Sequence, residues 1–250
     1  KKKPLSVGRA SARRIPSMRW KKCCWEDNNL EAKESIKRIL SENNPIAIKR
    51  RSEMRRALTN SAPSFLCPNC IGGLLFHDLG LQFRSPTVNL MMYQTDFVKF
   101  VLNLDDYLEQ KLIFFKHPEY SFPCAHLGDI AIHFTHYRSE EEATHAWRER
   151  SKRIDRDNLF VFLEERDGLT KEDILRLGSI HACGLVVFTA NAYPDIPYAL
   201  QIQKYERDGE VGNILRKSYL DEHHEYEEYF DFVKWFNLAN GDFDIALYKK

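Results

Sequence analysis

Cys70 is the side chain of this sequence that is best placed to do chemistry. Residues 64–73 read Ser-Phe-Leu-Cys-Pro-Asn-Cys-Ile-Gly-Gly, a short apolar run that ends in a tight turn, and a helix-like run closed by Gly80 follows. Strand, turn and helix in this order present a reactive group or hold a ligand in many α/β folds. The dipole at a helix start favours a cysteine thiolate. The pattern marks Cys70 as a candidate nucleophile; the alternative is a small buried residue in a tight turn.

Acyl transfer through a thiolate also needs a histidine base and a group that orients this base. The candidate bases are His133 and His136, at the C-terminal end of an expected buried strand, and the candidate orienting carboxylate is Asp167, in a turn after a later strand. The carboxyl ends of parallel strands meet at one edge of a sheet, where ligands bind. We therefore expect these three side chains to lie beside Cys70 as the catalytic group.

Other residues are candidates for binding a substrate. Backbone N–H groups at two consecutive glycines could stabilise an oxyanion or a phosphate, and an arginine at a strand end could pair with phosphate or sugar-acid groups. Asp129 lies four strand residues, or ~13 Å, from His133, so the two side chains cannot touch in a regular strand. Asp129 and Asp167 could instead act as acid and base on a glycosidic bond. The expected substrate-binding set is Asn69, Gly72, Gly73, Asp129, Arg166 and Thr189.

Two short motifs suggest other chemistry. The Cys67-Pro68-Asn69-Cys70 spacing is that of a redox dithiol or of half a zinc site. A structural zinc site needs four ligands and the chain has no second Cys-x-x-Cys, so we expect no metal site and keep redox and zinc as lesser alternatives. Asp242-Phe243-Asp244 spells the metal motif of nucleotide-sugar transferases, in a polar terminal segment.

Composition places the chain among soluble globular proteins of one large domain or two small ones. It has 250 residues, 43% of them hydrophobic and 29% charged, and no apolar run approaches the ~20 residues that cross a membrane. The basic start lacks the apolar stretch of a secretory leader. Six cysteines over this length do not resemble a disulfide scaffold. We therefore expect a cytoplasmic protein.

The charge is unevenly distributed. Residues 1–56 hold 17 Lys and Arg against 6 Asp and Glu, whereas residues 57–250 are net acidic. We expect a basic N-terminal extension over 1–56, partly disordered or helical, and a single α/β domain over 57–250. The extension could contact an anionic membrane such as the inner membrane, a nucleic acid or the chain's own acidic body, or could be a solvated arm. A nucleic acid is the least favoured partner, because the body is acidic.

Apolar runs alternate with helical patterns along the body. This alternation predicts a three-layer α/β/α sandwich with a mostly parallel or mixed sheet. Expected strands are 65–67, 112–115, 130–134, 159–163 and 185–188, and expected helices are 30–43, 48–58, 72–79, 95–108, 139–153, 170–177 and 226–236.

An ordered series of motifs carries a family resemblance over about residues 57–237. The series is Asn69-Cys70-Ile71-Gly72-Gly73, Leu79-Gly80-Leu81, Ser85-Pro86-Thr87, Leu127-Gly128-Asp129-Ile130, His133-Phe134-Thr135-His136-Tyr137-Arg138-Ser139-Glu140, Arg153-Ile154, Asp157-Asn158-Leu159-Phe160, Arg166-Asp167-Gly168 and Phe188-Thr189. It resembles the bacterial domain of unknown function commonly labelled exopolysaccharide biosynthesis protein. The family usually has serine in place of Cys67 and asparagine in place of Pro68, so a Cys67–Cys70 pair is special to this chain.

The resemblance implies an α/β/α fold and a role in making or modifying surface polysaccharide, and it supplies no mechanism. Together with the cysteine it favours acyl transfer to a glycan or its activated precursor, with a donor such as a coenzyme A thioester. One alternative is a glycosyltransferase that uses a nucleotide-sugar. Another is a non-catalytic protein of the same pathway that binds a glycan or partner enzymes.

Overall fold

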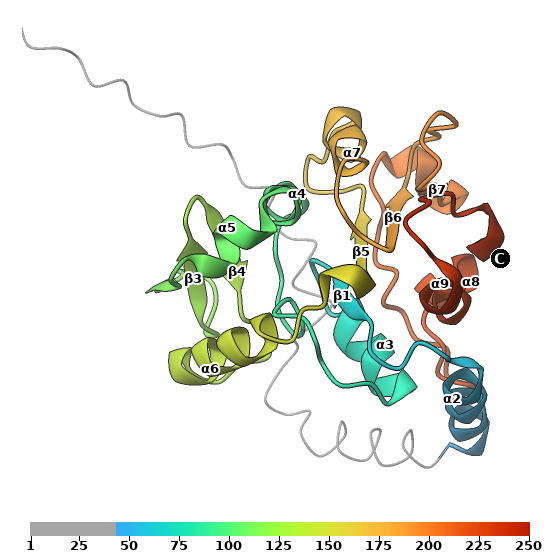
Figure 1. Ribbon diagram of the computed structural model, residues 1–250, viewed down its shortest axis with the longest axis horizontal. Helices are drawn as coiled ribbons and strands as arrows, with labels where there is room; N and C mark the ends of the chain where they lie inside the picture. The colour runs from blue at the N-terminus through green and yellow to red at the C-terminus, as the bar shows by residue number, and fades with distance from the viewer. Residues whose placement is uncertain (1–43) are drawn as a thin grey trace, which may run out of the picture.

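A four-stranded parallel sheet forms the centre of the protein. The computed structural model describes residues 44–250, so the helix expected over 30–43 and most of the basic extension lie outside the described residues. The strands are β1 (Ser64–Leu66), β5 (Leu159–Glu164), β6 (Gly184–Thr189) and β7 (Ala199–Gln201), in the order β1-β5-β6-β7 (Figure 1). Every residue of β5 and β6 is buried, as expected for strands covered on both faces.

Helices cover both faces of this sheet, which confirms the predicted α/β/α sandwich (Figure 1). On one face lie α3 (Ile71–Leu79) and α9 (Phe232–Leu238), and on the other lie α4 (Gln94–Leu102) and α7 (Lys171–Leu177). Aromatic rings fill the first interface: Phe65 of β1 lies 6.0 Å from the ring of Phe76 and 5.5 Å from that of Phe236. This dense packing fixes where α3 starts relative to β1.

A second sheet of three antiparallel strands lies beside the sandwich. It consists of β2 (Ile113–Phe115), β3 (Cys124–Leu127) and β4 (Ile130–His133), with α5 (Leu104–Glu109) and α6 (Glu140–Ser151) next to it (Figure 1). The expectation that 130–134 is a buried strand of the parallel sheet is wrong. Its apolar residues are buried because β4 packs against α4, and a tight turn with Gly128 at φ +60° returns it along β3.

Several expected elements are confirmed with shifted or divided bounds. The helix expected over 95–108 divides into α4 and α5 at Asn103, and that over 226–236 divides into α8 (Tyr226–Tyr229) and α9 because Phe230 is extended and bridges to Lys249. The sequence did not indicate β3 and β7. The remaining helical elements are α2 (Pro45–Ala57), η2 (Arg156–Asn158), η3 (Gln203–Asp208) and η4 (Ala246–Tyr248).

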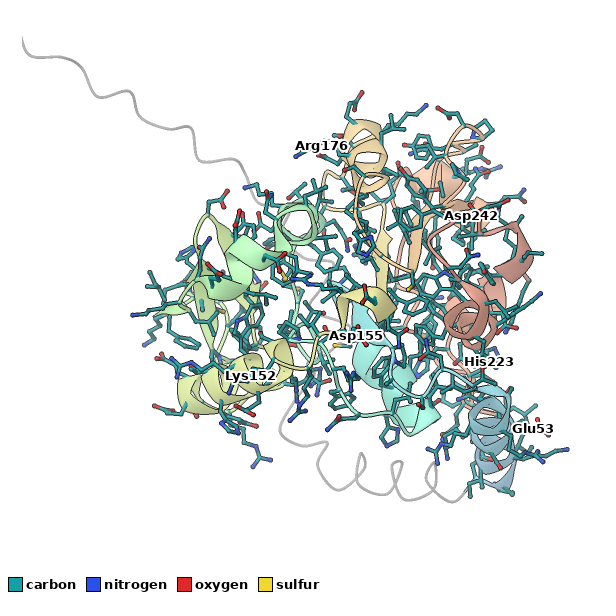
Figure 2. The ribbon with its side chains drawn as sticks, viewed as in Figure 1. Glu53, Lys152, Asp155, Arg176, His223 and Asp242 are labelled. Carbon is teal, nitrogen blue, oxygen red and sulfur yellow. The ribbon has the colours of Figure 1, made fainter. Side chains whose placement is uncertain are left out.

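Charged side chains lie mainly on the outer surface. The side chains of three labelled residues point outward: Glu53 of α2, Lys152 just after α6 and Arg176 of α7, which are 53%, 71% and 61% exposed (Figure 2). Within residues 44–250, no helix combines the length and apolarity needed to cross a membrane.

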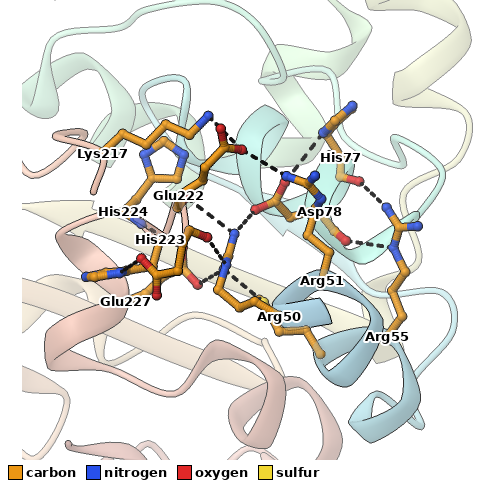
Figure 3. Close-up of polar contacts among 12 residues, drawn as sticks. Arg50, Arg51, Arg55, His77, Asp78, Lys217, Glu222, His223, His224 and Glu227 are labelled. Carbon is orange, nitrogen blue, oxygen red and sulfur yellow. Dashed lines mark hydrogen bonds and ion pairs between the residues drawn. The ribbon is translucent and has the colours of Figure 1, made fainter. Parts of the chain in front are cut away.

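The arginines of α2 contact the acidic body of the protein. Arg50 pairs with Asp78 of α3 and, at 2.6 Å, with Glu227 of α8, while Arg51 pairs with Glu222 at 3.1 Å (Figure 3). Arg55 donates to two main-chain carbonyls at the end of α3. For this part of the basic extension, the contact with the chain's own body is therefore observed. We call Arg50, Arg51, Arg55, Asp78, Glu222 and Glu227 the α2 clasp.

Candidate functional site

The turn between β1 and α3 places Cys70 at the start of a helix, as the sequence predicts. Cys70 is the residue before the first helical position, and its carbonyl accepts the first helical hydrogen bond, from Leu74. The neighbouring Asn69 supplies the side-chain cap, because its Oδ1 accepts from the N–H of Ile71 at 3.0 Å. Asn69 is buried, whereas Cys70 is half-buried.

Cys67 has a structural place in the same turn. Its Sγ donates to the carbonyl of Asn69 and accepts from the N–H of Gly72, each at 3.2 Å. The side chain is fully buried, and this burial raises the pKa of the thiol to about 12. A thiol held in its protonated form is a poor partner for disulfide exchange. The geometry therefore favours packing over a redox pair.

The two glycines after Cys70 serve close packing. A Cβ on Gly72 would lie 2.8 Å from Cys67 Sγ, and one on Gly73 would lie 2.4 Å from Asn89 Oδ1. The N–H of Gly72 is already bonded to Cys67, and both glycines are buried. The N–H of Gly72 is thus directed to Cys67, and donation from Gly72 or Gly73 to an oxyanion or phosphate stays a prediction.

His136 reaches the sulfur of Cys70. Its Nε2 lies 3.2 Å from Cys70 Sγ, and its side chain is exposed to solvent. Main-chain pairing brings the two segments together: Met92 N–H donates to the Pro68 carbonyl at 2.9 Å, and Met91 exchanges two hydrogen bonds with His133. The predicted cysteine–histidine pair is thus present, although the histidine follows an antiparallel strand.

His133 has a different environment from His136. It is 2% exposed, and burial lowers its pKa to about 4, with the nearby His117 acting in the same direction. The imidazole therefore stays neutral near pH 7 and is a weak base. Its ring faces Tyr93 and Tyr120 at centroid distances of 5.6 and 5.7 Å. Of the two expected bases, His136 is the one that contacts the sulfur.

A buried carboxylate connects the Cys70 turn with the end of β5. Glu164 Oε1 accepts from Asn69 Nδ2 at 2.9 Å, and Oε2 lies 3.4 Å from Arg166 Nη1. Asp167 follows in the left-handed conformation, at φ +55°, and its Oδ1 lies 3.9 Å from Arg166 Nε. Arg166 and Asp167 are thus on the same edge as Cys70. The contact between Asp167 and a histidine remains a prediction.

Asp129 and Thr189 are positioned by contacts of their own. Asp129 lies in the turn before β4, at the opposite end of that strand from His133. It accepts from Lys99 and Tyr107, and these hydrogen bonds lower the pKa of its carboxyl. Thr189, at the end of β6, donates to the carbonyl of Asn191. The structure therefore does not join Asp129 to the Cys70 site, and it gives the Thr189 hydroxyl a role in the following loop.

Comparison with known proteins places the chain in a family. Residues 41–237 match the family described as Domain of unknown function (DUF1919). The chain belongs to this DUF1919 family. A protein of Haemophilus influenzae, named "Uncharacterized protein", is 39% identical over 186 residues, which are 74% of this chain and 89% of the relative. The family match over residues 41–237 includes α2, Cys70, His136 and the end of β5.

Aromatic and histidine side chains beside the site of this DUF1919 chain were not anticipated from the sequence. In the loop between β2 and β3, the ring of Tyr120 stacks on His117 at 4.2 Å and on Phe122 at 4.8 Å, and all three side chains are half-buried. Burial raises the pKa of the Tyr120 hydroxyl, and the nearby Glu119 acts in the same direction. Burial raises the pKa of the Tyr93 hydroxyl to about 12, and the neighbouring Tyr120 and the charge of Asp167 add to the rise. The irregular loop gives no periodic pattern that a sequence analysis could detect.

The other motifs show local roles. Within residues 44–250, no three His, Cys, Asp or Glu side chains are grouped so that they could hold a metal ion. Asp242 Oδ1 accepts from the N–H of Asp244, and Asp244 Oδ1 accepts from that of Ala246. These are the turn contacts typical of aspartate in loops.

Proposed function

We propose that this protein is an acyltransferase of surface-polysaccharide assembly, with Cys70 as the nucleophile and His136 as the acid and base. The contact of 3.2 Å between Cys70 Sγ and His136 Nε2, at the start of α3, carries the proposal. A histidine next to the thiol and the helix dipole both favour the thiolate. The exposure of His136 leaves the pair open to a substrate.

The reaction would proceed in two steps. In the first, the Cys70 thiolate attacks the carbonyl carbon of an acyl thioester; the new C–S bond forms as the donor thiolate leaves and takes a proton from His136. In the second, His136 removes the proton of a sugar hydroxyl, whose oxygen attacks the acyl carbon and displaces the Cys70 thiolate. The acyl group moves from sulfur to oxygen, and the enzyme returns to its starting state.

Two features support an anionic donor and a glycan acceptor. Arg166, held near Asn69 through Glu164, offers a guanidinium for the phosphates of a donor such as coenzyme A. The stack of His117, Tyr120 and Phe122 provides partly exposed apolar ring surface on which a sugar can pack. The resemblance to proteins labelled exopolysaccharide biosynthesis points to the same acceptor class.

A direct test is to incubate the purified full-length chain with acetyl coenzyme A, without an acceptor, and to map the product by mass spectrometry. We expect one acetyl group on Cys70 in the wild type and none in Cys70→Ala. Cys183→Ala, which removes another half-buried cysteine, is the matched control and should leave the acetyl group on Cys70.

A second experiment tests the acceptor. In a host whose surface polysaccharide loses acyl groups when this gene is deleted, the wild-type gene should restore them and Cys70→Ala should not. If Cys70→Ala restores the acyl groups, Cys70 is not the nucleophile. A protein that carries no acyl group and still binds the glycan would favour the non-catalytic alternative.

A further inference from the structure

Glu164 connects the two segments that form the Cys70 site. It ends β5, is 1% exposed, and lies between the turn that carries Cys70 and the loop that carries Arg166. One carboxylate oxygen accepts from Asn69 Nδ2 at 2.9 Å, and the other lies 3.4 Å from Arg166 Nη1. Its backbone N–H donates to Gln94 Oε1 at 3.2 Å, which fixes the strand end.

We propose that Glu164 is a positioning residue that controls the Cys70 site through its ionisation, holding Asn69 and Arg166 together when it carries a charge and releasing Arg166 when it is protonated. This inference rests on the proposed function, because it concerns the reactivity of Cys70. Glu164 acts through Asn69 and need not contact the substrate.

The contacts transmit the charge of Glu164 to the start of α3. The side-chain amide of Asn69 has only one arrangement in which Nδ2 faces the carboxylate and Oδ1 accepts from the N–H of Ile71. Ile71 is the first helical residue after Cys70, so the carboxylate fixes the cap that orients the cysteine. Protonation turns the charge-assisted bond from Asn69 into a weaker neutral one, which loosens the cap, and it removes the attraction to Arg166.

The surroundings of Glu164 bring this ionisation into the neutral pH range. Burial raises the pKa of its carboxyl to about 7, with Arg166 and Asn69 opposing the rise and Asp167 adding to it. Among the residues that face it from other elements, Cys67 is titratable and is protonated near neutral pH, while Asn69 and Gln94 are neutral. Arg166 is therefore the nearby cation that favours the ionised form of the Glu164 carboxyl.

The test measures the rate at which iodoacetamide alkylates Cys70 in the full-length chain between pH 5 and 9, with the modified peptide identified by mass spectrometry. For the wild type we expect a step in the rate near pH 7 that comes from Glu164, in addition to the titration of the Cys70 thiol itself. Glu164→Gln, which keeps the shape and removes the charge, should abolish this step and lower the rate at pH 8 about fivefold, the factor that corresponds to replacing a charged hydrogen bond by a neutral one.

Glu165→Gln is the matched control. Glu165 is also buried, but its carboxylate accepts from the N–H groups of Ala190 and Asn191 in the loop after β6. This variant should destabilise the protein and still keep the step near pH 7. If Glu165→Gln also loses the step, then the loss in Glu164→Gln reflects a general destabilisation of the fold, and the inference is overturned.

Arg166→Gln provides a second variant in case Glu164→Gln does not fold. Without the cation the ionised carboxylate loses its partner, so the step should move upward by about one pH unit. An unchanged profile in Glu164→Gln, or an unshifted step in Arg166→Gln, would overturn the inference while leaving a reactive Cys70 intact. A wild-type Cys70 that reacts no faster than an ordinary thiol would instead contradict the proposed function, and with it the inference.

Discussion

The two ends of α3 make different kinds of contact. At its C-terminal end, Arg55 donates to the carbonyls of His77 and Asp78, and Arg50 pairs with the Asp78 side chain. Cations placed there complement the helix dipole. At the N-terminal end, ~13 Å away for a helix of nine residues, Cys70 and the exposed His136 face each other.

This difference separates stability from reactivity within one element. In the α2 clasp, charges that are mostly half-buried are matched by opposite charges and main-chain carbonyls, so the groups hold each other in place. At the Cys70 end, buried residues such as Asn69 and Glu164 hold the turn, while the thiol and the imidazole remain accessible. Substitutions at the two ends should therefore affect different measurements.

The largest effect on stability should come from Arg50→Met. The change leaves Asp78 and Glu227, 13% and 11% exposed, without their cation, so we expect a loss of about 3–5 kcal/mol in the free energy of unfolding. Urea unfolding would measure it. Lys49→Met, which removes a neighbouring cation that is 78% exposed, is the control and should change stability by about 0.5 kcal/mol or less. If both variants unfold alike, the clasp is not a major source of stability.

The next largest effect is the pH dependence of stability that Glu164 causes. Burial raises the pKa of the Glu164 carboxyl from 4.5 to about 7, so the folded state favours the protonated form. The contribution of this carboxyl to stability is therefore complete below pH 4.5 and is lost as the pH rises through 7. This is about 3 kcal/mol. The depressed pKa of His133, about 4, has the opposite sign, with stability lost as the pH falls below 6.5. Urea unfolding of both proteins would measure how much less stable Glu164→Gln is than the wild type. We expect this loss in the free energy of unfolding to be about 3 kcal/mol larger at pH 4.5 than at pH 7. A difference that does not vary with pH would contradict the burial of an ionisable Glu164.

A smaller effect is expected at Gly72. An added Cβ would meet Cys67 Sγ at 2.8 Å and Phe65 at 3.4 Å, so Gly72→Ala should cost about 1–3 kcal/mol. Cys67→Ala makes room, and the cost of Gly72→Ala in that background should fall, which a double-mutant cycle would show. Gly209→Ala, in a turn with open space around it, should show no coupling to Cys67. Strictly additive effects would show that Cys67 does not fill the space beside Gly72.

The smallest effect on stability is expected for His136→Ala. The side chain is exposed, so its removal should change the free energy of unfolding by about 0.5 kcal/mol or less. Thermal or urea unfolding at pH 7 would check this. A large loss would indicate that His136 belongs to the packed structure and not to an open site.

Local patterns in the sequence predicted the turn and the cysteine well. The apolar run, the turn residues and the glycine pair place Cys70 before α3, and Gly80 ends the helix at φ +69°. The contact between Cys70 and His136 was also predicted, but from a wrong assignment of 130–134 to the parallel sheet. It forms because Met91 pairs with His133, a long-range contact that no local pattern encodes.

Other parts of the site depend on tertiary structure and escaped prediction. An aspartate such as Asp129 is a plausible site residue by type, but the turn in which it lies directs its carboxylate to Lys99 and Tyr107. Glu164 looks like any acidic residue that ends a strand, and only its burial against Asn69 and Arg166 distinguishes it. Residue type identified the chemistry that is available, whereas contacts between distant segments decided which residues meet.

The most direct test of the cysteine–histidine pair is the pH dependence of Cys70 alkylation in the wild type and in His136→Ala, with Cys183 as the internal reference. We predict that wild-type Cys70 reaches half its maximal rate well below pH 8.5, the ordinary value for a cysteine thiol, and that His136→Ala slows alkylation at pH 7 about tenfold. A Cys70 that titrates as an ordinary thiol, with the same rate in both proteins, would contradict the claim that the start of α3 holds a reactive cysteine–histidine pair.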